Sequence, residues 1–400
     1  MVEINKKVLK NGFTIIHEKR DLPITTIMLS VKFGSSYEEK KEKGIAHFIE
    51  HLCFKGTEKR GSLTIAKEIE EIGGILNAVT QEEFTSYFAK IPSIHLKKAA
   101  EVLFDIFFNP IFPEDEIKKE AKVICEEIKM YKDNPSYFVL DRIKSNLYEE
   151  PFGMNIAGTE ENVLSFPRKK LIEIHNKFYT PENSFLVVVG NNDFSEICKL
   201  VEELIPERKF GGKIVIPKII LKNNREIIER KELEQTNLTI GFHFPFNSLN
   251  DFLSSEIFCS ILGEGMSSKL FSEVREKRGL VYTIKSYLEN GKNFSYLVIY
   301  AGTNLKSVEE VIKISLNEFS KISYLTKEEF EKAKEKVIGN FLVENEDSIN
   351  AAMNISFFES LNKLEGYLKF EEEIRKVKLE DIYKLASLRK YSLVVLKPKS

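Results

Sequence analysis

Two stretches decide the fold of this chain: TTIMLSVKF at residues 25–33 and TNLTIGFHF at residues 236–244. Both are rich in β-branched residues and alternate in polarity, which predicts a strand in each case. After each strand the chain repeats one order: an apolar helix, a second helix that ends at glycine, two strands and two further helices. Gly74 and Gly279 end the second helix of the two halves, 205 residues apart. A duplication of this size predicts two similar domains.

The expected elements follow the apolar periodicity of each half. In the first half they are helices at 44–54, 63–72, 95–107 and 114–131, and two strands within 76–91. In the second half they are helices at 252–262, 269–277, 307–319 and 326–344, and strands at 282–287 and 294–300. Each half closes with a helix, near Leu171 or Leu379, and a strand, at 184–189 or 391–396. We therefore expect an α+β fold of two tandem domains, each a mainly antiparallel sheet packed with helices.

The 400 residues suit two domains, which we expect at 1–210 and 225–400, joined by a linker at 211–224. With 42% hydrophobic and 30% charged residues, the chain can bury two cores and is not disordered. The net charge of -2 argues against a nucleic-acid-binding protein. No apolar run reaches the roughly 20 residues of a membrane helix, and the N-terminus lacks a signal-peptide core. Four widely spaced cysteines predict free thiols and a cytoplasmic location.

The segment His47-Phe48-Ile49-Glu50-His51 lies in the first predicted helix. Positions i and i+4 share one helix face, so both imidazoles can reach one metal ion. Glu50 points to nearly the same side, where it can take a proton from a metal-bound water. This is the zincin motif in reverse order, and it predicts a zinc site with His47 and His51 as ligands and Glu50 as general base.

A catalytic zinc site needs a third protein ligand and an open position for water. In the helix at 114–131, Glu120 and Glu127 lie seven residues apart on one face, whereas Glu126 points about 100° away from Glu127. Helix geometry alone leaves both Glu120 and Glu127 open as the third ligand. The other histidines are isolated and are expected to be structural or exposed: His17, His95, His175 and His243.

Together these features resemble the pitrilysin/insulinase family of zinc metallopeptidases, the inverzincins, which includes the mitochondrial processing peptidase. The resemblance covers nearly the whole chain, which is similar to the two-domain bacterial members of the family. It rests on the zinc motif, on EAKVICEEIKMYKDNP at residues 120–135, on GGILNA at 73–78 and on Gly158-Thr159. It implies that one zinc ion binds to each chain with Glu127, 76 residues after His51, as the third ligand. Glu120 would then be a neighbouring acid that orients a ligand.

The resemblance also implies roles for two residue pairs outside the metal motif. Asn77 and Ala78 would lie on an edge strand that a peptide substrate joins through its backbone. The second half has no histidine at the matching residues 252–259 and is expected to bind no zinc. It carries Arg275 and Tyr282, which would bind the substrate carbonyl and its developing oxyanion.

The implied function is that of a zinc-dependent endopeptidase. It would hydrolyse short or unstructured peptides by attack of a zinc-bound water, with Glu50 as the base. Two alternatives are a non-catalytic assembly subunit of the same family and a metal-binding protein without hydrolysis. The complete set of ligands, base and Arg–Tyr pair argues against the first, and Glu50 argues against the second.

Long single-chain relatives have four such domains, with the zinc motif in the first and the Arg–Tyr pair in the fourth. The resemblance therefore implies that this two-domain chain forms a homodimer, in which Arg275 and Tyr282 of one chain serve the zinc of the other. The alternative is that the two halves of one chain fold onto each other and act alone. Peptides are the expected substrates. Neither a nucleic acid nor a membrane is expected as a partner.

Overall fold

The computed structural model describes residues 3–208 and 215–399. These residues form two compact units that interleave along the chain. The first unit is built from the ranges Met1–Ile128, Asn155–Pro217 and Val343–Leu368. The second is built from Lys129–Met154, Lys218–Leu342 and Lys369–Ser400.

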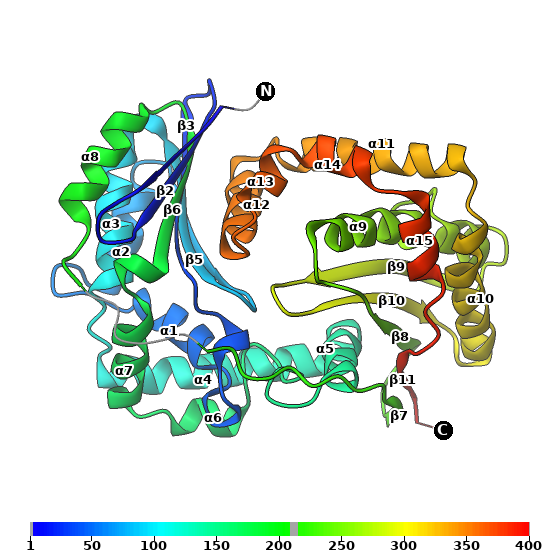
Figure 1. Cartoon of the computed structure of the whole chain (residues 1–400). Helices are drawn as coiled ribbons and strands as arrows, with labels where there is room; N and C mark the ends of the chain where they lie inside the picture. The colour runs from blue at the N-terminus through cyan, green and yellow to red at the C-terminus, as the bar shows by residue number, and fades with distance from the viewer. Residues whose placement is uncertain (1–2, 209–214, 400) are drawn as a thin grey trace. The chain divides into compact units, whose positions relative to one another are not determined.

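The first unit is organised around a sheet with the strand order β1-β2-β6-β3-β5-β4 (Figure 1). The strands are β1 (Ile4–Val8), β2 (Thr14–Lys19), β3 (Ile24–Val31), β4 (Ile75–Thr80), β5 (Thr85–Pro92) and β6 (Ser184–Gly190). Strands β2 and β6 are parallel, and the other neighbouring pairs are antiparallel. Strand β4 is hydrogen-bonded to β5 and forms one edge of the sheet.

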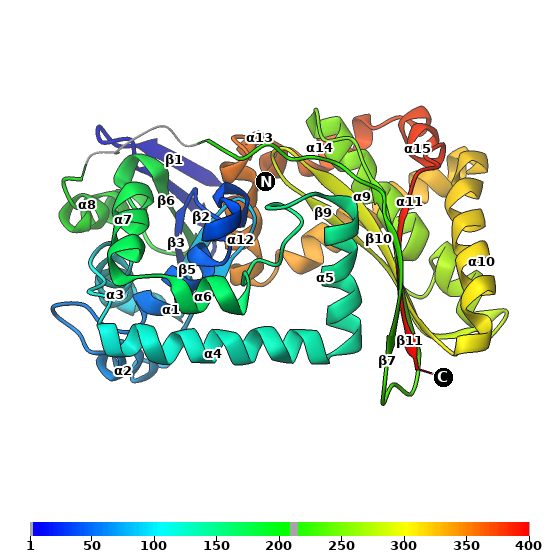
Figure 2. The same ribbon diagram turned by 90° about the horizontal axis from the view of Figure 1, so that it is seen from below.

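Helices cover both faces of this sheet (Figures 1 and 2). Those on one face are α1 (Ile45–Cys53), α2 (Ser62–Glu70), α3 (Leu96–Phe108), α7 (Arg168–Phe178) and α8 (Phe194–Leu204). They bury a core of aliphatic and phenylalanine side chains. On the other face lie α12 (Ser348–Ser360) and α13 (Leu364–Leu368), which come from the second half of the sequence. The short α6 (Glu160–Ser165) precedes α7, and the long α4 (Glu114–Asp133) leads out of this unit.

The second unit repeats this plan with the strand order β7-β11-β8-β10-β9. Its strands are β7 (Arg225–Arg230), β8 (Thr236–His243), β9 (Val281–Asn290), β10 (Ser295–Thr303) and β11 (Ser392–Pro398). Its helices are α5 (Pro135–Leu147), α9 (Leu249–Gly263), α10 (Val308–Lys321), α11 (Lys327–Glu344), α14 (Phe370–Lys376) and α15 (Leu379–Ala386). Helices α5 and α9 lie on opposite faces of the sheet (Figure 1). A π-helix at Phe271–Glu276 occupies the predicted helix at 269–277.

The duplication predicted from the sequence is confirmed by these two sheets. The order β2-β6-β3-β5-β4 corresponds strand for strand to β7-β11-β8-β10-β9, including a single parallel pair in each sheet. The left-handed glycine after the second helix is Gly73 in one unit, with φ 74°, and Gly279 in the other, with φ 61°. Gly73, and not Gly74, is therefore the counterpart of Gly279 by backbone conformation.

The compact units do not coincide with the contiguous ranges 1–210 and 225–400, because the two halves exchange helices. Helix α5 packs Val139, Ile143 and Leu147 against the second sheet. Gly241 on β8 makes room for it, since an added Cβ would lie 2.9 Å from Ile143. Apolar burial decides which sheet such a helix covers, whatever its position in the sequence.

Helix α12 makes the reciprocal exchange. Near its start Ser348 bonds to Thr26 at 2.8 Å, and Ser356 donates to the Met28 sulfur at 3.3 Å. Of the expected linker, residues 211–214 lie outside the described residues, and residues 215–224 contain no helix.

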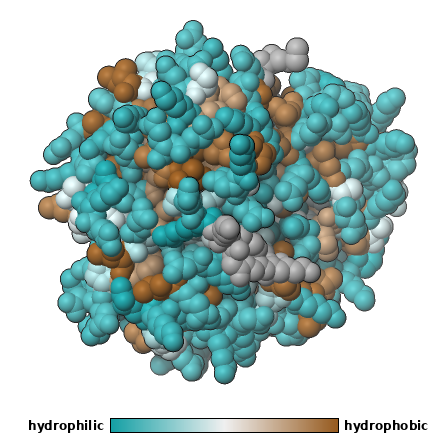
Figure 3. All heavy atoms as spheres, turned by 60° about the vertical axis from the view of Figure 1, so that its left-hand side comes forward, coloured by the Kyte–Doolittle hydropathy of each residue, from teal (hydrophilic) through white to brown (hydrophobic). Residues whose placement is uncertain are grey.

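Hydrophilic side chains cover most of the face drawn in Figure 3, with apolar side chains in smaller groups among them. Among the described residues, no helix combines the length and the apolar character that crossing a membrane requires. All four cysteines are buried, and none of them forms a disulfide, as their spacing predicts.

Candidate metal centre

The helix that carries the zinc motif begins at a backbone turn that two buried side chains hold in place. Gly44 precedes α1 with φ 99°, in the left-handed region. The Glu38 carboxylate accepts hydrogen bonds from the amides of Gly44, at 3.1 Å, and Ala46, at 2.8 Å. Lys43, which is fully buried, lies 3.7 Å from the same carboxylate and donates to the Ser35 carbonyl. An acidic group at a helix N-terminus is favourable, so this pair fixes where α1 starts.

The Gly158-Thr159 motif supports the same turn. Gly158 has φ 77°, and a Cβ there would lie 2.2 Å from the Lys43 carbonyl oxygen. A Cβ on Gly44 would lie 2.6 Å from the Ala157 carbonyl oxygen. The two backbones therefore approach closely because neither residue has a side chain.

Gly158→Ala should lower the free energy of unfolding by at least about 2 kcal/mol, since it adds a backbone clash to the cost of a left-handed alanine. Gly73→Ala is the matched control: Gly73 has a similar φ of 74° but no atom within 4 Å of its added Cβ. Chemical denaturation of both variants measures the difference. Equal losses of unfolding free energy in the two variants would show that the close approach of Gly158 to Lys43 makes no difference to stability.

Three side chains from two helices converge on one point. His47 and His51, one turn apart on α1, have ring centroids 4.7 Å apart. Glu127 of α4 places its Oε2 3.8 Å from the His47 Nε2 and 3.7 Å from the His51 Nε2. In residues 3–208 and 215–399 this is the one group of His, Cys, Asp or Glu side chains whose donor atoms, all within 4.8 Å of one another, could hold a metal ion.

The donor set fits zinc. Two imidazole nitrogens and a carboxylate oxygen are the protein ligands of many catalytic zinc sites. In a tetrahedral site with bonds of about 2.0–2.1 Å, ligand atoms lie about 3.3–3.4 Å apart. The Glu127 Oε2 is 3.7–3.8 Å from the two Nε2 atoms, so a small inward movement of the side chains would suit the ion. Burial and the neighbouring His51 lower the pKa of His47 to about 4, so its imidazole is neutral and able to bind a cation at pH 7. His17, His175 and His243 instead contact backbone carbonyls.

Glu50 lies beside the three candidate ligands but is not one of them. Its Oε2 accepts a hydrogen bond of 2.5 Å from the Thr80 hydroxyl, at the end of the edge strand β4. Burial raises the pKa of Glu50 to about 6, although the Thr80 hydrogen bond and His51 oppose the shift. A carboxyl group with a pKa near neutrality is suited to accepting and releasing a proton.

Glu120 contacts the outer nitrogen of His51. Its Oε2 lies 3.1 Å from the His51 Nδ1, and its Oε1 lies 2.7 Å from the Lys55 Nζ. Burial would raise the pKa of Glu120, but the bonds from His51 and Lys55 outweigh it and lower the pKa. Glu120 therefore stays ionised and accepts the Nδ1 proton, which leaves the His51 Nε2 free to face Glu127. Helix periodicity left both Glu120 and Glu127 as candidates for the third ligand, and the structure places them at different nitrogens of His51.

Asn77 and Ala78 lie on β4, as predicted, and Asn77 is exposed. The Asn77 Oδ1 accepts a hydrogen bond of 2.8 Å from the Ala78 amide. An edge amide is therefore occupied by a side chain that a substrate strand would have to displace.

Arg275 and Tyr282 are neighbours within the second unit. The Arg275 guanidinium lies 5.7 Å from the centroid of the Tyr282 ring and 4.8 Å from that of Phe271. Tyr282, at the start of β9, is 80% exposed, which leaves its hydroxyl accessible to another molecule.

Sequence reasoning missed three residues of this region: Glu38, Lys55 and Thr80. Lys55 lies four residues after His51, and this helical spacing was a usable signal. Thr80 lies three residues after Asn77, but its contact with Glu50 joins a strand to a helix 30 residues away. No spacing rule predicts such a contact.

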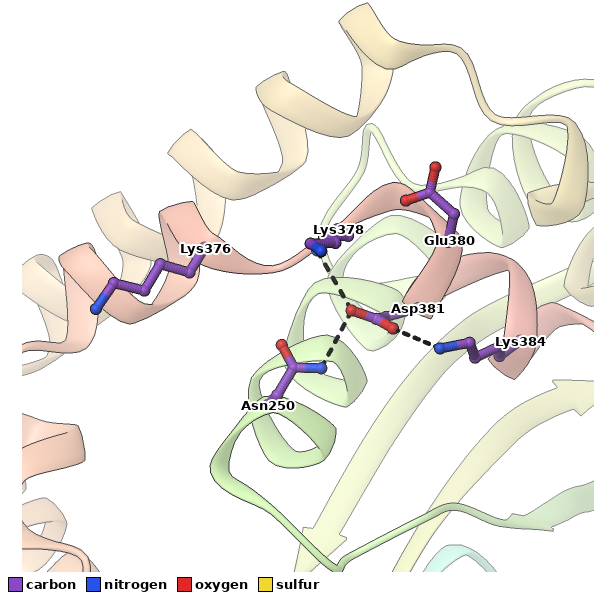
Figure 4. Close-up of a pocket in the computed structure, with 6 residues that line it drawn as sticks. All are labelled: Asn250, Lys376, Lys378, Glu380, Asp381 and Lys384. Atoms are coloured by element: carbon purple, nitrogen blue, oxygen red, sulfur yellow. Dashed lines mark hydrogen bonds and ion pairs between the residues drawn. The ribbon is translucent and has the colours of Figure 1, made fainter.

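A separate hollow of about 660 Å³ lies in the second unit, near the start of α15 (Figure 4). Asp381 at its centre accepts bonds from Asn250, at 3.1 Å, and Lys384, at 2.9 Å. Lys376 pairs with Glu372 and Glu373. These side chains bind one another through hydrogen bonds and ion pairs. We therefore interpret the residues around the hollow as a cluster that caps α15 and ties it to α9.

The sequence of this chain matches a known family of proteins. The family described as "Insulinase (Peptidase family M16)" matches residues 14–160, and "Peptidase M16 inactive domain" matches residues 165–337. An "uncharacterized zinc protease" of Rickettsia felis is 36% identical over 347 residues, which are 86% of this chain and 84% of that protein. One of Bacillus subtilis is 32% identical over 405 residues, 99% of this chain and 98% of that protein.

Solved structures share the fold. A protease from Helicobacter pylori matches over 100% of both chains, with a TM-score of 0.91 and 23% identity. A Pseudomonas fluorescens protein described as a peptidase M16 inactive domain matches over 100% of this chain and 98% of its own, with a TM-score of 0.89 and 20% identity. From the zinc motif, the duplicated fold and the sequence matches together, this chain belongs to the insulinase family, peptidase family M16.

Proposed function

We propose that this chain is a zinc-dependent endopeptidase that cleaves short or unstructured peptides. The observation that carries the proposal is the arrangement around α1: three ligand atoms converge, while the carboxyl group of Glu50 is held beside them by Thr80. A site that only stores metal has no need of such a base. The Rickettsia felis and Bacillus subtilis relatives, both named as zinc proteases, support the same class of activity.

His47, His51 and Glu127 would hold the zinc ion, one per chain. When bound, zinc supplies a positive charge that polarises the scissile carbonyl and acidifies a water molecule. Glu50 accepts the proton of the attacking water on the oxygen that Thr80 leaves free, and then gives it to the leaving amine. Glu120 holds the His51 ring in the tautomer that leaves Nε2 as the donor atom.

The remaining predicted residues would bind substrate. Asn77 and Ala78 would receive an extended peptide along β4, where backbone hydrogen bonds give affinity with little side-chain selectivity. Arg275 and Tyr282 would stabilise the negative charge that develops on the carbonyl oxygen. The alternative of a non-catalytic assembly subunit requires none of these groups, and the chain retains all of them.

Purified protein should cleave unstructured fluorescent peptides, and removal of the metal by a chelator should abolish the cleavage. Added zinc should restore activity, because the same three ligands can bind the ion again. Peptide hydrolysis and metal content, measured on the same samples, provide the test. A stably folded protein, offered as the control substrate, should resist. Cleavage that continues in metal-free protein would refute the zinc mechanism.

We propose further that two chains form a homodimer with shared active sites, in which Arg275 and Tyr282 of each chain serve the zinc of its partner. The exposure of Tyr282, 80%, supports this because its hydroxyl is accessible to another molecule, as a residue that serves a partner's site must be. A cytoplasmic location remains a prediction from the sequence.

Mixing two inactive variants should restore activity if the sites are shared. Glu50→Gln and Tyr282→Phe chains combined under subunit exchange would form a heterodimer with one doubly defective site and one intact site. About half of the protein would be heterodimer after random exchange of equal amounts, so peptide hydrolysis should recover to roughly a quarter of wild type. Tagged chains verify that exchange occurs. Exchange without any recovery would mean that each chain builds its own site.

A further inference from the structure

Lys55 is the charged residue that contacts Glu120 on the side away from the His51 ring. It follows α1 and lies four residues after His51. Its Nζ contacts the Glu120 Oε1 at 2.7 Å, while the other oxygen of Glu120 faces the His51 Nδ1 at 3.1 Å. The side chain of Glu120 is 7% exposed and that of Lys55 27%. Both oxygens of a nearly buried carboxylate are therefore engaged, one by the ring and one by the lysine.

Two carboxylates of α4 lie near the two ring nitrogens of His51. Glu127 faces Nε2 and Glu120 faces Nδ1, and the two acids are separated by two helical turns on one face of α4. A divalent cation attracts both. If Glu120 also became a ligand, four protein ligands would close the site, as in structural zinc sites, and the position needed for water would be lost.

We propose that Lys55 is a positioning residue that keeps Glu120 on the His51 ring and out of the metal's coordination shell. The ammonium group neutralises Glu120 and anchors one of its oxygens away from the ion. The site can then keep a position for water beside His47, His51 and Glu127. The inference rests on the proposed function in one respect only: these three residues must bind the metal.

Cobalt substitution reports coordination directly and does not need peptidase activity. Cobalt(II) replaces zinc in such sites, and its visible absorption changes when an added anion, here azide, displaces a bound water. Wild-type protein should show an azide-dependent shift. Lys55→Met, which keeps the apolar stem but not the charge, should lose this shift because Glu120 occupies the position. The double variant Lys55→Met/Glu120→Gln should regain it.

Two single variants control for charge and for folding. Lys55→Arg retains the cation and should behave as wild type. Lys119→Met removes another lysine that pairs with an acid of α4, Glu116 at 2.6 Å, and should leave the spectrum unchanged. If Lys55→Met is poorly folded, Lys55→Gln makes the same comparison, because it also removes the charge.

Measurement of zinc affinity provides a second test of the role of Lys55. Lys55→Met should bind zinc as tightly as wild type or more tightly, whereas Glu120→Gln should lose about 10–100-fold, the usual effect of removing a partner of a ligand. An azide shift in Lys55→Met equal to that of wild type would overturn the proposal. If wild-type protein cleaves no peptide but the spectra behave as expected, the role of Lys55 stands and the proposed peptidase function fails.

Discussion

Glu50→Gln should reduce peptide hydrolysis by a factor on the order of 10³ while the protein keeps its zinc. Glutamine still accepts the Thr80 hydrogen bond through its amide oxygen, so the local structure should persist. Its amide nitrogen cannot accept a proton from water, and general-base catalysis is lost. The ion should remain, because Glu50 is absent from the group of ligand atoms formed by His47, His51 and Glu127.

Hydrolysis of a peptide substrate and zinc content should be measured together on wild type and variant. Glu58→Gln, an exposed glutamate beyond the end of α1, is the matched control and should be fully active. Loss of both zinc and activity in Glu50→Gln would make Glu50 a ligand. Undiminished activity would exclude it as the base.

Glu127→Gln should weaken zinc binding by more than about 100-fold, beyond the 10–100-fold usual for residues that only support a ligand. The variant replaces a charged donor whose oxygen lies 3.7–3.8 Å from both histidine nitrogens. Competition with a chelator of known affinity measures the loss. Peptide hydrolysis should fall in parallel, since the active form needs the ion.

Glu126→Gln is the control for this experiment, because Glu126 is the next residue of the same helix but is exposed. It should bind zinc as wild type does. Glu120→Gln should fall between the two. Similar losses for Glu126 and Glu127 would mean that α4 presents a different face to α1.

The fold class, the duplication and part of the site could be predicted from the sequence. His47 and His51 could be paired from spacing alone, because a helix places residues four apart on one face. The third ligand could not, because Glu120 and Glu127 occupy the same face of α4, and only the resemblance to a family favoured Glu127. The structure places Glu127 near the Nε2 atoms of both histidines and Glu120 at the Nδ1 of His51, and these distances depend on how α1 and α4 pack.

What the sequence did not predict depends on contacts between distant elements. Strands β1 and β7 were missed because INKKV and REIIER are dominated by charged or polar residues. The amphipathic pattern of α5 predicts that one face is buried, but it does not say which sheet buries it. The same limit hid Thr80, whose neighbour in sequence gives no sign of Glu50.

The exchange of helices between the halves has a consequence for synthesis on the ribosome. The first unit includes α12 and α13, so one face of its sheet stays uncovered until residue 368 has been translated. Until then Met28 and the other apolar groups on that face are open to water and to other nascent chains. The zinc ligands all precede residue 128, yet the unit that holds them is completed only near the end of translation. Duplication here has produced halves that cannot mature one after the other. A chain that ends at residue 368 would lack part of the second unit, whereas one that ends before residue 343 would lack parts of both units.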